Sequence, residues 1–469
     1  MFETIIDTIN TFLYSKLLIV ILIGSGIYFT IRTRFPQVRL FRKACNAVME
    51  KPEGKESVSS FQALMVSTAS RVGTGNIVGV SSAICIGGVG SVFWMWIIAI
   101  LGSASALAES TLAQIYKKKG EDGRCYGGPA YYIEAALHSR GLAVVFCIAM
   151  ILTYAFGFNM LASYNLQSTF AGQPFYNADI TPWIIGGILA LVMGWCLLGG
   201  GNRIVKVTST LVPFMGIAYI LVSLFIVVLN IGQLPSVMAQ IFKEAFDFKA
   251  IFAGFAGSAM MQGIRRGLYS NEAGIGSANA AASAVVSHPV KQGLVQMLSV
   301  FIDTLLLCTA TAMMCLVSGV IPAKELQGAP WVQAALHKTL GSFGPYFIMI
   351  AMVLFAFTTL LGNCFYCDNL LTYIHKKQPG RKFMTGFRIV SALAVFFGAG
   401  MEMTLLWHIS DVLMGVMALI NIPVILILSN TVVKALKDYE IQIQQKKNPV
   451  FFSKNIDLKQ KTDYWNEKN

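Results

Sequence analysis

Apolar segments long enough to cross a lipid bilayer recur along nearly the whole chain. Most of them reach the roughly 20 residues that a membrane helix requires. Only 13% of the 469 residues are charged, against about 25% in soluble domains. A soluble fold with this much apolar sequence would need a core larger than one domain normally supports. We therefore expect an all-α polytopic membrane protein.

The hydropathy pattern predicts about eleven transmembrane helices, of which the second and the seventh are broken. The expected spans are 12–31, 60–86, 91–116, 141–171, 181–199, 207–231, 250–287, 292–319, 344–375, 385–400 and 404–430. With the first span set aside, the broken helices open two five-helix repeats, 60–231 and 250–430, as in inverted-repeat transporters. Residues 1–59 would supply an extra N-terminal helix and a basic linker. Residues 431–469 would form a cytoplasmic tail that is partly disordered.

The basic residues fall mainly on one side of the predicted membrane. With the N-terminus placed outside, the inward-facing segments carry 28 of the 36 Lys and Arg residues. This asymmetry follows the positive-inside rule and predicts a cytoplasmic C-terminus in a multi-pass protein of the cell membrane, plasma or inner. The same asymmetry accounts for the net charge of +13. We therefore expect the lipid bilayer as a partner and no nucleic acid.

The second span is interrupted by Val72-Gly-Thr-Gly-Asn76. Two glycines beside a Thr and an Asn are expected to break the helix at mid-depth. Backbone groups freed in this way are tolerated only where protein or a water-filled cavity meets them, and half-helix ends can then bind ions and substrate. A glycine-lined packing seam is the alternative, but it does not need the polar atoms of Thr74 and Asn76.

A second interruption is predicted over Gly263–Ser277, which contains Arg265, Arg266 and Glu272. Charged side chains at membrane depth are unfavourable unless they are paired or face water. A cytoplasmic loop is the alternative. We expect a broken helix whose lower part turns inward.

Three further acids, Glu109, Asp303 and Asp368, lie within predicted spans. Acids at such positions are rare and usually functional, although a structural acid would be paired with an arginine or with a helix end. For Asp303, a structural network and a role in ion coupling are both open. Arg71, beside the first break, is a candidate partner for one of these acids.

The sequence gives little support for enzymatic or channel chemistry. Its nine cysteines are scattered and no His pair has metal-ligand spacing. Cys364-Phe-Tyr-Cys367 has C-x-x-C spacing, but it lies on a predicted membrane helix, where ordinary packing is expected. No nucleophile–base arrangement is recognisable, so we expect no enzyme and no cofactor. A channel would need successive polar rings, whereas the polar residues cluster at mid-depth.

Several motifs, in this order, resemble the alanine or glycine:cation symporter family (sodium:alanine symporters), with the fold of the leucine-transporter superfamily. They are Arg71–Gly79 (RVGTGNIVG), Gly87–Trp96 (GGVGSVFWMW), Gly127–Tyr132 (GGPAYY), Arg266–Ser277 (RGLYSNEAGIGS), Phe301–Thr304 (FIDT) and Phe357–Thr359 (FTT). The resemblance covers about 61–428. It implies a leucine-transporter-like 5+5 inverted repeat. It also implies sodium-coupled symport of small neutral amino acids, alanine or glycine, into the cell by alternating access, with Na⁺ as the coupling ion.

The resemblance also implies a binding site at the first break. The substrate carboxylate would meet the break, since a half-helix N-terminus is an anion site. The residues of the break are Gly73, Thr74, Gly75 and Asn76. The substrate side chain would meet Ala162, Ile264, Leu268 and Asn363. Sodium would be held by the hydroxyls of Thr358 and Thr359 and the backbone carbonyls of Ala69, Val72 and Phe355. Threonines in membrane helices often only hydrogen-bond the carbonyl one turn back, which is the alternative.

Two positions of the implied pocket depart from the family pattern. Family members often have Gln where this chain has Ala162, and Trp where it has Asn363. Both differences remove bulk, and Asn363 adds an amide. They suggest a roomier, more polar pocket that accepts a larger polar amino acid such as glutamine, with sodium or proton coupling.

Overall fold

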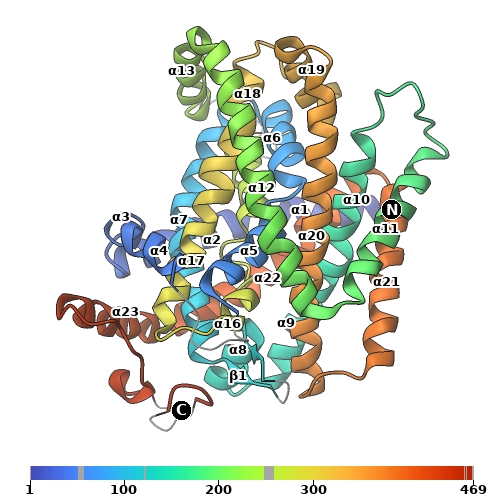
Figure 1. Cartoon of the computed structure of the whole chain (residues 1–469). Coiled ribbons are helices and arrows are strands. Elements are labelled where there is room, and N and C mark those ends of the chain that lie inside the picture. The colour runs from blue at the N-terminus through green and yellow to red at the C-terminus, as the bar shows by residue number, and fades with distance from the viewer. Residues whose placement is uncertain are drawn as a thin grey trace.

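The computed structural model describes residues 2–50, 58–120, 123–247, 258–458, 460 and 462–466. Apart from a two-stranded hairpin, β1 (Lys118–Lys119) with β2 (Cys125–Tyr126), the regular structure of this part is helical. Long helices run between two ends of the molecule (Figure 1), with α13 and α19 at the upper end and α8, α16 and β1 at the lower end.

Seven helical segments in the described ranges are long and apolar enough to cross a membrane. They are α7 (Ser91–Ile115), Arg140–Ser168, α12 (Gly200–Leu229), Pro289–Leu316, α20 (Phe343–His375), α21 (Arg381–Ala399) and α22 (Met403–Ile427). Shorter apolar helices cover Ile19–Arg32, Gly75–Gly87 and Thr181–Leu197. These segments confirm a helical polytopic membrane protein. Eleven crossings and the inverted repeat stay predictions.

The other named elements either form parts of these segments or connect them. They are α1 (Phe2–Phe12), η1 (Leu13–Leu18), α2 (Ile19–Arg32), α3 (Pro36–Arg39), α4 (Phe41–Val48), α5 (Ser60–Arg71), η2 (Gly75–Gly79), α6 (Val80–Gly87), α8 (Pro129–Leu137), α9 (Arg140–Ile151), η3 (Leu152–Phe158), α10 (Asn159–Ser168), α11 (Thr181–Leu197), η4 (Ile231–Gln233), α13 (Leu234–Ala245), α15 (Ala259–Asn271), α16 (Asn279–Ser283), α17 (Pro289–Val300), η6 (Phe301–Cys308), α18 (Thr309–Leu316), η7 (Lys324–Leu326), α19 (Ala329–Leu340), α23 (Ser429–Gln444) and η8 (Ser453–Ile456).

The first predicted break is present between α5 and η2. Ser59 and Gln62 form a capping box at the start of α5, which fixes where that helix begins. The helix ends at Arg71, and Val72 is extended, with φ −78° and ψ 90°. The chain resumes at Gly75 as a π-helical turn. Such turns are rare in proteins, and those that occur often lie at functional sites.

The second interruption lies further along the chain than predicted. Helix α15 continues unbroken through Gly263 and Gly267, and the irregular segment is 272–278, which begins with Glu272 in a left-handed conformation at φ 55°. The two glycines allow close packing on α7 instead. A Cβ on Gly263 would lie 2.4 Å from the Ser91 carbonyl oxygen. Residues 250–257 of the predicted span are outside the described residues.

The first and the last described segments of the chain pack against the helical body. The first helix runs beside α22, where the Tyr14 hydroxyl donates to the Asp411 carbonyl at 3.2 Å. The described part of the predicted tail contacts the helical body, and partial disorder of the tail stays a prediction. That part includes α23, and the Trp465 indole N–H donates to the Gln114 carbonyl at 2.7 Å. His288 caps α17 by accepting from the Val290 N–H at 3.2 Å.

Candidate substrate and ion site

The break between α5 and η2 leaves backbone donors free. The Asn76 side-chain oxygen accepts from the Gly73 N–H at 2.8 Å, and the Asn165 amide donates to the Thr74 hydroxyl at 3.0 Å. Among the described residues, the N–H groups of Thr74 and Gly75 have no hydrogen-bond acceptor. Since the break is buried, these donors lie screened from water at the start of a helix, an arrangement that suits an anion.

Aromatic side chains cover this break on the side of α6. A Cβ on Gly75 would lie 2.5 Å from the Tyr269 ring, so only glycine lets Tyr269 approach so closely. The Tyr269 ring lies 4.8 Å from the ring of Phe158 and 4.8 Å from that of Trp407, both edge to face. The three rings therefore close the site from this direction.

A buried ion pair lies next to this aromatic cover. The Arg266 guanidinium donates to both carboxylate oxygens of Asp411, at 3.3 and 3.2 Å, and stacks on Trp407 at 3.8 Å. Arg265 lies over the Tyr14 ring at 4.6 Å. The sequence interpretation did not single out Asp411, although an acid within the predicted eleventh span was the signal that could have found it.

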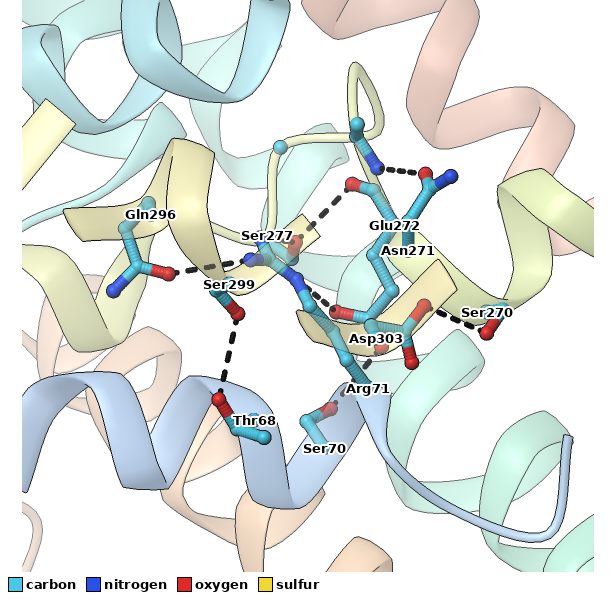
Figure 2. Close-up of polar contacts among 12 residues, drawn as sticks. Thr68, Ser70, Arg71, Ser270, Asn271, Glu272, Ser277, Gln296, Ser299 and Asp303 are labelled. Carbon is cyan, nitrogen blue, oxygen red and sulfur yellow. Dashed lines mark hydrogen bonds and ion pairs between the residues drawn. The ribbon is translucent and has the colours of Figure 1, made fainter. Parts of the chain in front are cut away.

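Asp303, on η6, accepts three hydrogen bonds from neutral side chains. The donors are the Asn76 amide, the Ser270 hydroxyl and the Thr304 hydroxyl, each at 2.7 Å. The bond from Ser270 is visible in Figure 2. Asp303 therefore joins η2, α15 and η6. Its cluster offers carboxylate and hydroxyl oxygens, which suit a hard cation.

Arg71 lies in a second buried cluster beside the break (Figure 2). Its Nε lies 4.0 Å from a carboxylate oxygen of Glu272, and its other nitrogens donate to Gln296 and Ser277 at 3.3 Å. Ser70 donates to the other oxygen of Glu272 at 3.1 Å. This pair links the end of α5 to the end of α15.

Glu109, Asp303 and Asp368 were the predicted candidate partners of Arg71. This prediction is wrong, because none of the three forms a direct ion pair with Arg71 among the described residues. Asp368 pairs with Arg388 at 3.1 Å, and Glu109 accepts from the Gly276 N–H at 3.1 Å and from Asn421. Glu272, which does lie beside Arg71, was placed in the second predicted interruption but was not named as a partner of Arg71.

The structure brings one of the two predicted sodium-binding threonines to the break. The Thr359 hydroxyl is buried without a hydrogen-bond partner among the described residues, and it lies 2.1 Å from where a Cβ on Gly73 would be. The Thr358 hydroxyl donates to the Leu354 carbonyl at 2.9 Å, the alternative expected for a helical threonine. Ala69, Val72 and Phe355 are buried.

The predicted side-chain pocket is only partly assembled. The Asn363 amide donates to Asn159 at 2.8 Å and its oxygen accepts from Ser70 at 2.7 Å, so this amide is engaged within the protein. Ala162 lies one turn from both Asn159 and Asn165, hence on the same face of α10. Ile264 and Leu268 are fully buried on one face of α15.

A cavity of about 1170 Å³ lies on the side of the break where α5 begins. Its walls come from the first turn of α5, the start of α12 and the end of α20, and include Gln62, Ser209, Phe365 and Thr372. Asp368 and Arg388 also line it. Aromatic rings therefore cover one side of the break, whereas the cavity lies towards the start of α5 and is lined by no residue of the break itself.

Comparison with known proteins places this architecture in a family. A family model described as the sodium:alanine symporter family matches residues 1–453. The chain is 43% identical over 454 residues to the probable sodium/glutamine symporter GlnT of Bacillus subtilis, covering 96% of this chain and 93% of the relative. It is 42% identical over 468 residues to the amino-acid carrier protein AlsT of Bacillus subtilis, covering 99% and 98%. It is 36% identical over 455 residues to the sodium/alanine symporter AgcS of Methanococcus maripaludis, covering 95% and 99%. The chain therefore belongs to the sodium:alanine symporter family.

Proposed function

We propose that this chain carries a small neutral amino acid, alanine or glycine, into the cell together with Na⁺. The observation that carries the proposal is the buried break between α5 and η2. Two N–H groups, of Thr74 and Gly75, and the hydroxyl of Thr359 near Gly73 have no hydrogen-bond partner among the residues that the structure describes. Donors suit a carboxylate and the hydroxyl suits a cation, so the interrupted helix together with the facing residue of α20 can serve both ligands.

In this proposal the substrate carboxylate binds at Gly73–Asn76, and its side chain faces Ala162, Ile264, Leu268 and Asn363. Sodium is held by the Thr358 and Thr359 hydroxyls with the carbonyls of Ala69, Val72 and Phe355. Sodium binding between α5 and α20 orders the break and so strengthens substrate binding. By thermodynamic linkage, the substrate strengthens sodium binding by the same factor.

Alternating access has support in the asymmetry around the break. The Arg266–Asp411 pair and the Tyr269 ring close one side, and the large cavity lies on the other. Transport would exchange these two arrangements. We further propose that residues 60–231 and 250–430 are inverted halves, preceded by an extra helix. The N-terminus would be outside, and the lower end in Figure 1, where β1 and α8 lie, would face the cytoplasm.

A larger polar amino acid such as glutamine is the second candidate substrate. One relative is named a probable sodium/glutamine symporter. Ala162 and Asn363 leave less bulk than the Gln and Trp often found at these positions in the family. Rotation of the Asn363 amide away from Asn159 would expose a polar group to the substrate side chain.

The test is uptake of radiolabelled alanine and glutamine into proteoliposomes. An inward sodium gradient is compared with a matched potassium gradient, in the parent protein and in Thr359→Ala. Sodium-driven accumulation that is lost in the variant is expected. Accumulation driven only by a proton gradient would overturn the ion assignment, and no accumulation of either amino acid would overturn the substrate class.

A further inference from the structure

The bend that follows α2 combines exposed basic and apolar side chains at the edge of the molecule, where α3 and α4 project in Figure 1. We propose that this bend, residues 31–49, binds the headgroups of anionic phospholipids. The segment contains five basic residues and no Asp or Glu. They are Arg32, Arg34, Arg39, Arg42 and Lys43.

Three of these cations have no partner within the described part of the chain. Arg32 donates to the Asn430 side chain at 2.9 Å, and Arg39 pairs with Glu440 at 2.7 Å. The side chains of Arg34, Arg42 and Lys43 are exposed and make neither a hydrogen bond nor an ion pair with the residues that the structure describes. They are therefore available to an external anion.

Large apolar side chains are interleaved with these cations. Val38 is 82% exposed, Met49 81%, Phe35 58% and Phe41 44%. Cations next to exposed apolar groups are the composition of segments that lie in the membrane interface, with the apolar groups among the acyl chains and the cations at the headgroups. Unpaired cations are disfavoured in hydrocarbon, which puts this bend at headgroup level.

A hydrogen-bonded turn at the end of α2 carries Arg34 and Phe35. The Arg34 N–H donates to the Ile31 carbonyl at 3.0 Å and the Phe35 N–H donates to the Thr30 carbonyl at 2.8 Å, so the left-handed conformation of both residues, with φ 59° and 53°, belongs to this helix end. Both side chains are exposed. The turn therefore places a cation and an aromatic ring together at the edge of the molecule.

The bend is attached firmly to the elements that hold the candidate ion site. The Gln37 amide donates to Thr30 at 2.8 Å and to the Ile100 carbonyl of α7 at 3.1 Å. The Phe41 ring stacks with that of Phe301 at 6.1 Å. Phe301 begins η6, the segment that carries Asp303. A headgroup bound at the bend would therefore act on the position of η6 through the Phe41–Phe301 contact. This holds whichever amino acid is transported.

The test measures the preference for spin-labelled phosphatidylglycerol over spin-labelled phosphatidylcholine at the protein in mixed vesicles. The test variant is the triple Arg34→Gln, Arg42→Gln, Lys43→Gln. The matched control is Lys376→Gln, Lys377→Gln, Lys382→Gln, which removes the same charge from the exposed connection between α20 and α21. A second variant, Arg34→Lys with Arg42→Lys, keeps the charge and reports on folding.

The parent is expected to prefer phosphatidylglycerol. In the triple variant, the affinity for phosphatidylglycerol relative to phosphatidylcholine should fall by about fivefold for each cation removed. The control and the lysine variant should keep most of the parent's preference. An equal loss of preference in the triple variant and its control would overturn the proposal, because it would show that only the total positive charge of the protein attracts the lipid. A preference that survives in the triple variant, or that inorganic phosphate abolishes at constant ionic strength, would overturn it as well. None of these outcomes depends on transport.

Discussion

Two buried carboxylates, Asp303 and Glu272, lie close to the same break but have different neighbours. Asp303 accepts three hydrogen bonds, all from neutral groups. Glu272 lies beside the guanidinium of Arg71 and accepts from Ser70. Both side chains are fully buried, so the charge of each must be balanced within the protein or by a ligand.

The difference separates a structural pair from a candidate ion-coupling group. Glu272 and Arg71 together are neutral and can stay buried through a transport cycle. Asp303 makes no ion pair with the described residues, so Na⁺ or H⁺ is its natural complement. The contrast favours ion coupling at Asp303, one of the two roles that the sequence left open.

The largest expected effect comes from breaking the neutral pair. Arg71→Gln leaves Glu272 buried without its cation, which should destabilise the protein by about 3–5 kcal/mol. The double variant Arg71→Gln, Glu272→Gln should recover much of this loss, because the uncompensated charge is gone. Thermal denaturation in detergent measures both. A single variant as stable as the parent would show that the pair does not hold the ends of α5 and α15 together.

Asp303→Asn is expected to affect ion dependence more than stability. Its neighbours Asn76, Ser270 and Thr304 can still hydrogen-bond an amide, so the fold should persist. The sodium dependence of substrate affinity should fall by about fivefold or more, the usual range of a coupling free energy. Titration of substrate binding against sodium concentration measures it, with Asp303→Glu as the control that keeps the charge. Unchanged sodium dependence would place Asp303 with Glu272 as a structural group.

A smaller effect is expected from filling the space between the break and its aromatic cover. Gly75→Ala would place a Cβ 2.5 Å from the Tyr269 ring, whereas Gly79→Ala would meet Trp407 at 3.6 Å, an ordinary contact. Overpacking of this kind typically destabilises by about 1–3 kcal/mol. Stability and uptake should therefore fall in Gly75→Ala and stay near the parent's values in Gly79→Ala. Equal effects would argue against close approach of Tyr269.

The last expected effect concerns selectivity at the wall near Glu272. Asn363 is hydrogen-bonded to Ser70, which also contacts Glu272, so this wall belongs to the structural cluster. Ala162→Gln refills the neighbouring position. It should shift the preference from glutamine towards alanine by about tenfold, the discrimination typical of small changes in pocket size. Competition uptake measures the shift. An unchanged preference would remove Ala162 from the pocket wall.

The sequence predicted the first break because its cause is local. Gly73 and Gly75 supply flexibility, and Asn76 supplies the acceptor that caps the freed N–H. The second interruption was predicted to begin at Gly263, whereas this glycine permits close packing on α7. That packing involves Ser91, which is 172 positions away in the sequence.

Partners of charged groups were the least predictable part of the site. Arg71 meets Glu272 and Arg266 meets Asp411 across separations of 201 and 145 positions. Hydropathy and spacing report which residues are buried but not which helices touch. The neutral donors around Asp303 were missed for the same reason, since Asn76, Ser270 and Thr304 come from three different elements.

The most direct test of the central claim is the affinity of purified protein for alanine and glutamine with and without sodium, by isothermal titration calorimetry, in the parent and in Thr359→Val. Valine keeps the branched shape and removes the hydroxyl beside Gly73. We predict that sodium strengthens binding in the parent and has little effect in the variant. Full sodium dependence in Thr359→Val would contradict a sodium site at the break between α5 and η2.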